Sequence, residues 1–474
     1  MIKFVTFASD KKLSALVCSS MAVLLTACGG QAVEDSPSQS ATAGFIASSE
    51  QATAPAVAIQ AQDSAITAAP QAGTAVTTEA DFAMSGYNAD TSHTQQGNIS
   101  AMQTAFAPQD DAALAPTTNT PQVTIPATTY KLYVSPSGND SSAGTATAPF
   151  RTLARAARST RAGTTVFVAP GTYDGGFKTT VHGTASARIY YVSTTKWGAK
   201  IVPPASSTNK VAWDNRGNYV DIIGFHVDGS APRAGTRWAS GIYSGGSYDM
   251  IRNNWVHHIA HNITCGSAGG SAIGVDSYYR GVKTDVVGNL VHDIGPAGCR
   301  YVQGIYISTS GTVKNNVVYR VAEGAIHLWH DAANVIITNN TVTASNTGII
   351  VGGGDFYFTS GPSDNNAVYN NIVYDNKMGI SEQGKTGRNN TYRNNLVFQN
   401  STYNWKLNNG LTHTSTITSS PLFVAYSRTG TPNLKLSASS PAIGRGTSAQ
   451  ALAYDFLERP RNASTGYDVG AYQH

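Results

Sequence analysis

The unit Asn315-Asn316-Val317-Val318-Tyr319 decides the fold, because close copies of it run through the second half of the chain. The next copy, Asn339-Asn340-Thr341-Val342-Thr343, begins 24 residues later. The other copies lie at 253–257, 288–292, 370–374 and 394–398. A unit that returns about every 24 to 35 residues indicates a solenoid, in which each repeat forms one coil.

Short apolar segments lie between these units, and each contains an isoleucine. In a strand, successive side chains point to opposite faces, so these isoleucines should stack inside the coil while the next residue points outward. Asparagines at a coil corner can bond to backbone groups and to one another, which satisfies polar atoms that burial would otherwise leave unpaired. We therefore predict two internal columns, one of asparagine and one of isoleucine. The isoleucines are Ile242, Ile273, Ile305, Ile326, Ile349 and Ile380.

A different pattern precedes the repeats. A short alternating strand at 131–134 is followed by a helix that Thr152 can cap, with Leu153, Ala156 and Ala157 on one face. This block resembles the N-terminal caps of pectate-lyase-like β-helix proteins, in which a short helix plugs the open end of the coil. The resemblance implies an all-β fold over residues 129–474, a right-handed parallel β-helix with a short N-terminal capping helix.

The chain ends in segments at 440–444, 459–461 and 468–472 that resemble the C-terminal segment of many secreted bacterial β-helix proteins. The two longest coil intervals, 254–289 and 340–371, carry extra residues that must leave the coil as loops. Loops beside a rigid wall often build the binding site, so these two intervals are expected to border it.

The first residues indicate export. Lys3, Lys11 and Lys12 precede an apolar run at 13–25, which is typical of a signal peptide covering residues 1–27. The run ends in Leu-Thr-Ala-Cys28, which resembles the lipobox of bacterial lipoproteins. The resemblance implies a lipid on Cys28 and an anchor in the outer membrane, facing either the periplasm or the outside.

Residues 28–128 are rich in Ala, Thr, Ser, Gln and Pro and contain no Lys or Arg, so we interpret them as a disordered tether. The formal net charge of the whole chain is +4, but the tether is acidic, which leaves about +11 on residues 129–474. This excess favours a polyanionic partner. The basic residues are dispersed and no nucleic-acid module is present, so we expect an acidic polysaccharide, no nucleic acid, and a monomer.

Cys265 and Cys299 are the cysteines after Cys28. They lie at nearly equal offsets from equivalent asparagines of neighbouring coils and should leave the coil at the same corner. We predict a disulfide between them, with two free thiols as the alternative.

Candidate site residues follow the outward direction on the middle coils. One outward wall contains Tyr243, Tyr306, His327 and Trp329, and a second column contains His257 and His292. The candidate catalytic residues are Lys314, Arg320, Tyr306, His327 and His292. The candidate substrate-binding residues are Tyr243, His257, Arg300, Trp329 and His330. Asp276 and Asp293 are candidate Ca²⁺ ligands, although neither lies in a loop as rich in ligands as an EF-hand.

We expect β-elimination on a uronic acid polymer. A cation such as Arg, Lys or Ca²⁺ would neutralise the uronate carboxylate, and a neutral Lys, His or Tyr would remove the proton at C5. The sequence leaves three alternatives open. These are C5 epimerisation, hydrolysis by two carboxylates, and a non-catalytic surface protein that binds polysaccharide.

Overall fold

A computed structural model describes residues 125–204, 210–230, 238–261, 263–265, 269–296 and 298–474. The predicted signal peptide, Cys28 and the tether up to residue 124 lie outside these residues. In the described part of the chain, no helix has both the length and the apolar character needed to cross a membrane.

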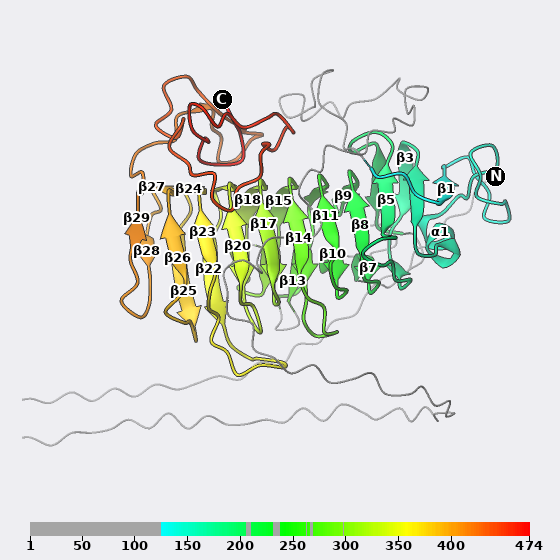
Figure 1. The fold of residues 1–474 in the computed structure, drawn as a ribbon, viewed down its shortest axis with the longest axis horizontal. Coiled ribbons are helices and arrows are strands. Elements are labelled where there is room, and N and C mark those ends of the chain that lie inside the picture. Colours follow the sequence, from blue (N-terminus) through cyan, green and yellow to red (C-terminus); the bar gives the residue numbers. More distant parts are fainter. Residues whose placement is uncertain (1–124, 205–209, 231–237, 262, 266–268, 297) are drawn as a thin grey trace, which may run out of the picture. The chain divides into compact units, whose positions relative to one another are not determined.

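The described chain is a right-handed parallel β-helix whose coils build three long parallel sheets (Figure 1). Sheet 1 contains β1 (Tyr130–Val134), β2 (Thr164–Val168), β5 (Ile189–Ser193), β8 (Val220–Ile223), β11 (Met250–Arg252), β14 (Thr284–Val287), β17 (Gly311–Lys314), β20 (Val335–Thr338), β23 (Ala367–Tyr369), β26 (Thr391–Arg393) and β29 (His413–Thr414). Sheet 2 contains β3 (Gly171–Asp174), β6 (Ala199–Val202), β9 (His226–Asp228), β12 (Trp255–His257), β15 (Leu290–Ile294), β18 (Val317–Val321), β21 (Thr341–Thr343), β24 (Ile372–Tyr374) and β27 (Leu396–Phe398). Sheet 3 contains β4 (Phe177–Thr179), β7 (Val211–Asn215), β10 (Ser240–Ser244), β13 (Gly270–Val275), β16 (Val302–Ile307), β19 (Gly324–Leu328), β22 (Thr347–Gly353), β25 (Met378–Gly384) and β28 (Tyr403–Lys406).

Both predicted internal columns are confirmed. The six isoleucines pair in register from β10 to β25, and each is fully buried. The asparagines form a ladder at the corner between sheets 1 and 2, where Asn289 Nδ2 donates to Asn316 Oδ1 (3.0 Å) and Asn316 Nδ2 donates to Asn340 Oδ1 (3.0 Å). Each amide also donates to a backbone carbonyl, so the buried polar atoms at this corner are paired.

The asparagine before each ladder residue makes the turn itself. Asn315, Asn339 and Asn370 have φ values of 54°, 56° and 55°, in the left-handed region that asparagine tolerates better than most residues. The Asn-Asn pair therefore has two separate functions, with the first residue turning the chain and the second joining neighbouring coils.

The N-terminal end is closed as predicted. Helix α1 (Leu153–Ser159) begins after Thr152, whose hydroxyl accepts a hydrogen bond from the backbone N–H of Arg155 (3.1 Å). Its buried residues are Leu153, Ala156 and Ala157, and the first two belong to the main core cluster. Figure 1 shows α1 at the end of the solenoid where β1 lies.

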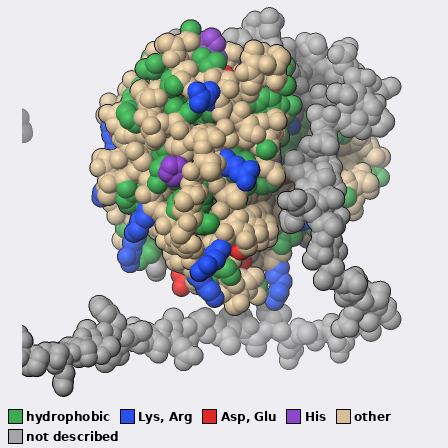
Figure 2. Space-filling view, turned by 60° about the vertical axis from the view of Figure 1, so that its left-hand side comes forward, with side chains coloured by type: hydrophobic (Ala, Val, Ile, Leu, Met, Phe, Trp, Pro, Cys, Tyr) green, Lys and Arg blue, Asp and Glu red, His purple; other side chains and the backbone are tan. Residues whose placement is uncertain are grey.

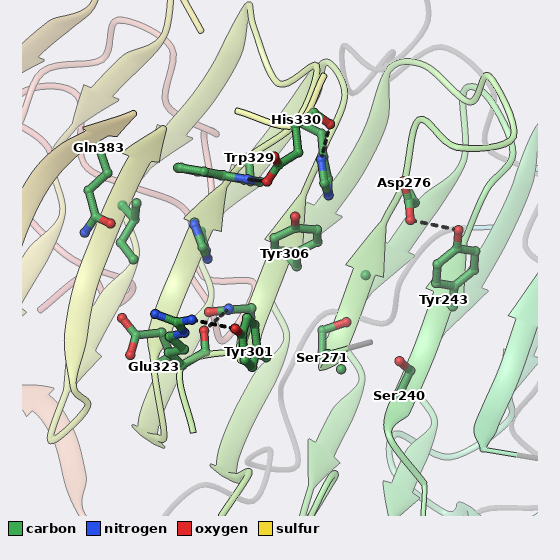
Figure 3. A pocket seen from close by; sticks show the side chains of 18 of the residues that line it. Ser240, Tyr243, Ser271, Asp276, Tyr301, Tyr306, Glu323, Trp329, His330 and Gln383 are labelled. Atoms are coloured by element: carbon green, nitrogen blue, oxygen red, sulfur yellow. Dashed lines mark hydrogen bonds between the residues drawn. The ribbon is translucent and has the colours of Figure 1, made fainter. Parts of the chain in front are cut away.

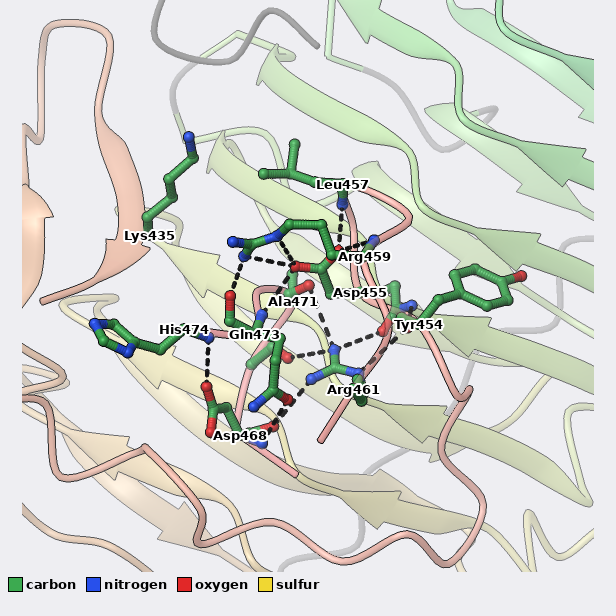
Figure 4. A network of polar contacts seen from close by, with 12 residues as sticks. Lys435, Tyr454, Asp455, Leu457, Arg459, Arg461, Asp468, Ala471, Gln473 and His474 are labelled. Atoms are coloured by element: carbon green, nitrogen blue, oxygen red, sulfur yellow. Dashed lines mark hydrogen bonds and ion pairs between the residues drawn. The ribbon is translucent and has the colours of Figure 1, made fainter. Parts of the chain in front are cut away.

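The C-terminal segment after β29 folds back over sheet 2, and it includes the antiparallel pair β30 (Phe423–Ala425) and β31 (Asn433–Leu436). Leu434, Phe456 and Tyr472 of this segment cluster with Val317 and Tyr319 of β18. A polar network holds the segment together internally (Figure 4), and a hydrogen bond from it also reaches the coil. In it, the buried Arg461 donates to Asn315 Oδ1 (2.9 Å) and to the backbone oxygen of Gly470 (3.0 Å). The chain beyond the repeats is thus a cover for one sheet.

Candidate functional site

One outward wall of sheet 3 forms as predicted. Tyr306 of β16 pairs in register with Gly274 of β13 on one side and His327 of β19 on the other. Gly274 in turn pairs with Tyr243 of β10. Because Gly274 has no side chain, the wall is recessed between Tyr243 and Tyr306.

A pocket of about 660 Å³ opens on this wall. In Figure 3, Trp329 and His330 lie toward one edge, Tyr301 and Glu323 toward the opposite edge, and Tyr306 between them. Seven of the predicted site residues line it, namely Tyr243, Asp276, Arg300, Tyr306, His327, Trp329 and His330.

His327 is the chemically distinctive residue of the pocket. Both of its ring nitrogens are buried, and neither has a hydrogen-bond partner among the described residues. Burial, with a smaller contribution from repulsion by His330, lowers the pKa of His327 to about 3. The imidazole is therefore neutral at physiological pH and retains a free lone pair and a free N–H. An unpaired buried polar group is costly in a folded protein, which is a reason to look for a bound partner.

Tyr306 is the neighbour of His327. Their ring centroids lie 5.4 Å apart with the planes nearly perpendicular, at 85°. Burial, with the nearby Tyr357 and Asp276, raises the pKa of Tyr306, so its phenol stays protonated. The pocket thus offers a neutral base and a neutral acid side by side.

Three carboxylates border the pocket. Asp276 accepts hydrogen bonds from Tyr243 Oη (3.0 Å) and Ser308 Oγ (2.8 Å). Burial raises the pKa of Glu323, which accepts a hydrogen bond from Asn346 Nδ2 (2.8 Å). The third carboxylate is Asp355, which the indole of Trp329 contacts (3.3 Å).

Arg300 is the only Lys or Arg among the described residues that line the pocket. Its guanidinium donates to Tyr301 Oη (2.6 Å) and is exposed. The excess positive charge of residues 129–474 is therefore not concentrated here, and Figure 2 shows Lys and Arg side chains scattered singly over one face of the molecule.

Two loops build a rim above the pocket, and they come from the two longest coil intervals, as expected. Asp331 joins them, because its carboxylate accepts from Ser277 Oγ (3.1 Å) on one loop and from the backbone N–H of Thr359 (3.0 Å) on the other. Tyr357 stacks on His330 with centroids 4.0 Å apart, and its hydroxyl lies 2.8 Å from His330 Nε2. The positions of these loops were predicted, but Tyr357 was not predicted to lie at the site.

The disulfide between Cys265 and Cys299 is present, as predicted. It joins the insertions that precede β13 and β16. Gly269 and Gly270 follow one cysteine, Arg300 and Tyr301 follow the other, and all four residues line the pocket. The bond therefore supports one edge of the site.

The structure does not bring all five candidate catalytic residues together, because Lys314, Arg320 and His292 lie outside the pocket that contains Tyr306 and His327. Lys314 is a buried residue at the end of β17 on sheet 1, where burial lowers its pKa against the opposing effect of Asp285. Arg320 and His292 lie on sheet 2, where the C-terminal segment covers the second outward column. The sequence showed which residues point away from the coil, but not that a later segment covers this sheet.

The prediction that Asp276 and Asp293 bind Ca²⁺ together is also wrong. Asp276 follows β13 of sheet 3, whereas Asp293 lies in β15 of sheet 2. Asp293 accepts two hydrogen bonds from Arg320, at 2.6 and 2.7 Å, and contacts His292 Nδ1 at 2.6 Å. The two carboxylates do not share a site. His257 likewise lies on sheet 2 and does not line the pocket.

The fold and the pocket define the class of protein, a parallel β-helix with a pocket on one lateral sheet. Residues 136–180 match the model of a protein family of unknown function, DUF1565. No curated protein matches the chain.

Several solved structures are similar to the chain. The pectate lyase Pel9A has 17% identity and a TM-score of 0.44, over 73% of this chain and 97% of that chain. The A-module of the mannuronan C-5 epimerase AlgE4 of Azotobacter vinelandii has 14% identity and a TM-score of 0.40, over 53% and 68%. The alginate lyase of Paenibacillus sp. str. FPU-7 has 15% identity and a TM-score of 0.37, over 56% and 92%.

Proposed function

We propose that the protein is a polysaccharide lyase that cleaves an acidic, uronate-containing polysaccharide by β-elimination in the sheet 3 pocket. The observation that supports this most directly is the His327 imidazole, which is neutral, buried at both nitrogens and unbonded, beside the protonated phenol of Tyr306. A base and an acid in contact with one bound sugar are the two groups that elimination requires.

The proposed step balances as follows. A ring nitrogen of His327 takes the C5 proton of the uronate, and the electron pair of that C–H bond forms the C4–C5 double bond. The C4–O bond breaks, and the departing oxygen takes the proton of Tyr306. His327 then loses its proton and Tyr306 regains one through solvent, which restores the starting state.

The carboxylate of the sugar must be neutralised for C5 to become acidic. Arg300 is the cation that the described pocket provides. If Arg300 supplies this charge, the reaction proceeds without Ca²⁺. Asp276 and Glu323 lie on opposite sides of the pocket in Figure 3, so the carboxylates of the pocket do not converge on a shared Ca²⁺ site.

Hydrolysis is the second candidate, and Glu323 favours it. Burial raises the pKa of this carboxyl, as a general acid needs, and Asp276 and Asp355 are available as its partner. The two reactions differ in their products, since elimination leaves an unsaturated uronate and hydrolysis does not.

The deciding experiment incubates the purified protein with a panel of acidic polysaccharides, with and without Ca²⁺. Ultraviolet absorbance of unsaturated uronates and polymer size are followed together. A rise in absorbance that is lost in His327→Ala and kept in His413→Gln, an exposed histidine on β29, supports the lyase. Shortening without absorbance indicates a hydrolase, and binding without shortening indicates an epimerase or a binding protein.

A further inference from the structure

Sheet 2 contains a histidine cluster that the proposed reaction does not use. His226 of β9 and His257 of β12 face each other across neighbouring coils, with their Nε2 atoms 2.7 Å apart. Asp228 pairs in register with His257, and both histidines and Asp228 are at most 7% exposed. One donor atom from each of the three residues lies within 4.8 Å of the others.

The packing around the cluster holds the rings in place. His226 stacks on Trp255 with centroids 4.0 Å apart, and His257 stacks on His292 at 5.0 Å. His292 is itself fixed, because its Nε2 accepts from Trp255 Nε1 (2.8 Å) and its Nδ1 contacts the Asp293 carboxylate (2.6 Å). His292 is thus unable to serve as a ligand, but it orients His257.

The hydrogen bond at Nδ1 of His257 also orients this side chain as a metal ligand would be oriented. Its Nδ1 lies 2.6 Å from His258 Nδ1. When Nδ1 carries the proton and donates it to His258, the lone pair of Nε2 points toward His226. A ring N–H held by a neighbour is the usual arrangement of a metal-ligating histidine, and a bound ion would replace the present hydrogen bond between the two Nε2 atoms.

The site already attracts a cation. The Lys200 ammonium lies 2.6 Å from Asp228 Oδ2, and its side chain is 38% exposed, so it can move into solvent. Neutral imidazoles beside a carboxylate are preferred by Zn²⁺ and other late divalent transition metals rather than by Ca²⁺.

We propose that His226, His257 and Asp228 bind one divalent transition-metal ion, with Zn²⁺ as the best match. Zn–N bonds of about 2.0–2.1 Å in tetrahedral geometry place ligand nitrogens roughly 3.3 Å apart, so the two rings must separate by about 0.6 Å. Lys200 leaves Asp228 at the same time. The ion links two adjacent coils of sheet 2, away from the pocket of sheet 3.

The test uses the full chain without a polyhistidine tag, treated with EDTA and titrated with ZnCl₂ by calorimetry. We expect one equivalent of zinc, and an anomalous diffraction signal at the zinc edge between β9 and β12. Loss of one ligand in His257→Ala or His226→Gln should weaken binding more than about 100-fold, because even a lost second-shell partner costs about 10–100-fold. His413→Gln should bind zinc as the unchanged protein does.

Lys200→Met removes the competing cation without removing a ligand and should tighten zinc binding. This variant keeps the proposal testable if the ligand variants do not fold, which circular dichroism of the metal-free proteins would show. The proposal is overturned if no zinc binds at this stoichiometry, if both ligand variants bind zinc normally, if Lys200→Met leaves the affinity unchanged, or if the anomalous signal lies elsewhere.

Discussion

Tyr306 and His327 occupy paired positions on the neighbouring strands β16 and β19, so the acid and the base of the proposed reaction are fixed by one sheet register. Both rings stand on rigid strands rather than on loops. Their geometry should therefore be maintained without substrate.

Removal of either group should abolish most of the activity. We expect Tyr306→Phe and His327→Gln each to lower kcat by about 10²–10⁴-fold, the usual contribution of a positioned acid or base. The thermal unfolding midpoint should stay close to that of the unchanged protein, because neither polar group bonds to another described side chain. An equal loss of activity in His413→Gln would contradict this assignment.

The disulfide should affect both stability and substrate binding. The double variant Cys265→Ser/Cys299→Ser should lose about 2–4 kcal/mol of unfolding free energy, the typical contribution of one bond. Because the bond supports the edge formed by Gly270 and Arg300, KM should rise more than kcat falls. Denaturant unfolding and steady-state kinetics measure the two effects, and reduction of the unchanged protein should reproduce them.

Asp249 should make stability depend on pH. This carboxyl is buried, and burial raises its pKa to about 7, although Ser244 Oγ and the backbone N–H of Val220 donate to it. The folded protein therefore holds the proton more tightly than the unfolded chain, whose aspartate has a pKa near 3.8. The stabilisation of the folded state that results from this pKa difference is complete below about pH 4 and is lost as the pH rises to about 7.

The matched variant is Asp249→Asn, which resembles the protonated carboxyl at every pH. The difference in unfolding free energy between this variant and the unchanged protein should grow in favour of the variant from pH 4 to 7. Each unit of pKa difference corresponds to about 1.4 kcal/mol. A constant difference across this range would show that Asp249 does not titrate there.

Arg461 should be essential for the C-terminal cover. Replacement by Met leaves Asn315 Oδ1 without its buried donor and removes one of two donors to the carbonyl of Gly470, which Asn339 Nδ2 also contacts (3.3 Å). Each unsatisfied group costs about 1–3 kcal/mol, so the segment should detach and be cut by protease before the coils are. The exposed Arg445, changed to Met, is the control and should leave the digestion pattern unaltered.

Cys28 is proposed to carry the lipid anchor. In a Gram-negative host, Cys28→Ser should move the protein from the outer-membrane fraction to the soluble fraction. Mass spectrometry of the N-terminal peptide should find acyl groups on Cys28 only in the unchanged protein. Membrane retention of the variant would contradict the anchor.

Local patterns in the sequence predict the fold well, because the period of the Asn-Asn unit fixes the length of a coil and the alternation around each isoleucine fixes which side chains face inward. The same alternation predicts Tyr306, His327 and Tyr243 on one wall. These features depend on residues close in sequence or one coil apart.

The errors have a different origin. Arg320 lies on the outside of sheet 2, but a residue more than a hundred positions later contacts it, since its guanidinium donates to the carbonyl of Gly430. His292 stacks on Tyr319, which clusters with Tyr472 of the C-terminal segment. Asp276 and Asp293 lie on different sheets. Because the coils differ in length, the spacing of residues along the sequence does not predict which sheet each aspartate joins. Long-range packing decides both cases.

The asparagine ladder runs in one direction, since each amide donates to the amide of the following coil from Asn254 to Asn395. An interior coil is therefore interchangeable at this corner with any other coil that has an asparagine at the same position. Duplication or deletion of one whole coil in the gene would leave every remaining amide with a donor and an acceptor. The solenoid can thus change its length during evolution, and with it the length of the outward wall of sheet 3, while its buried polar groups at this corner stay paired.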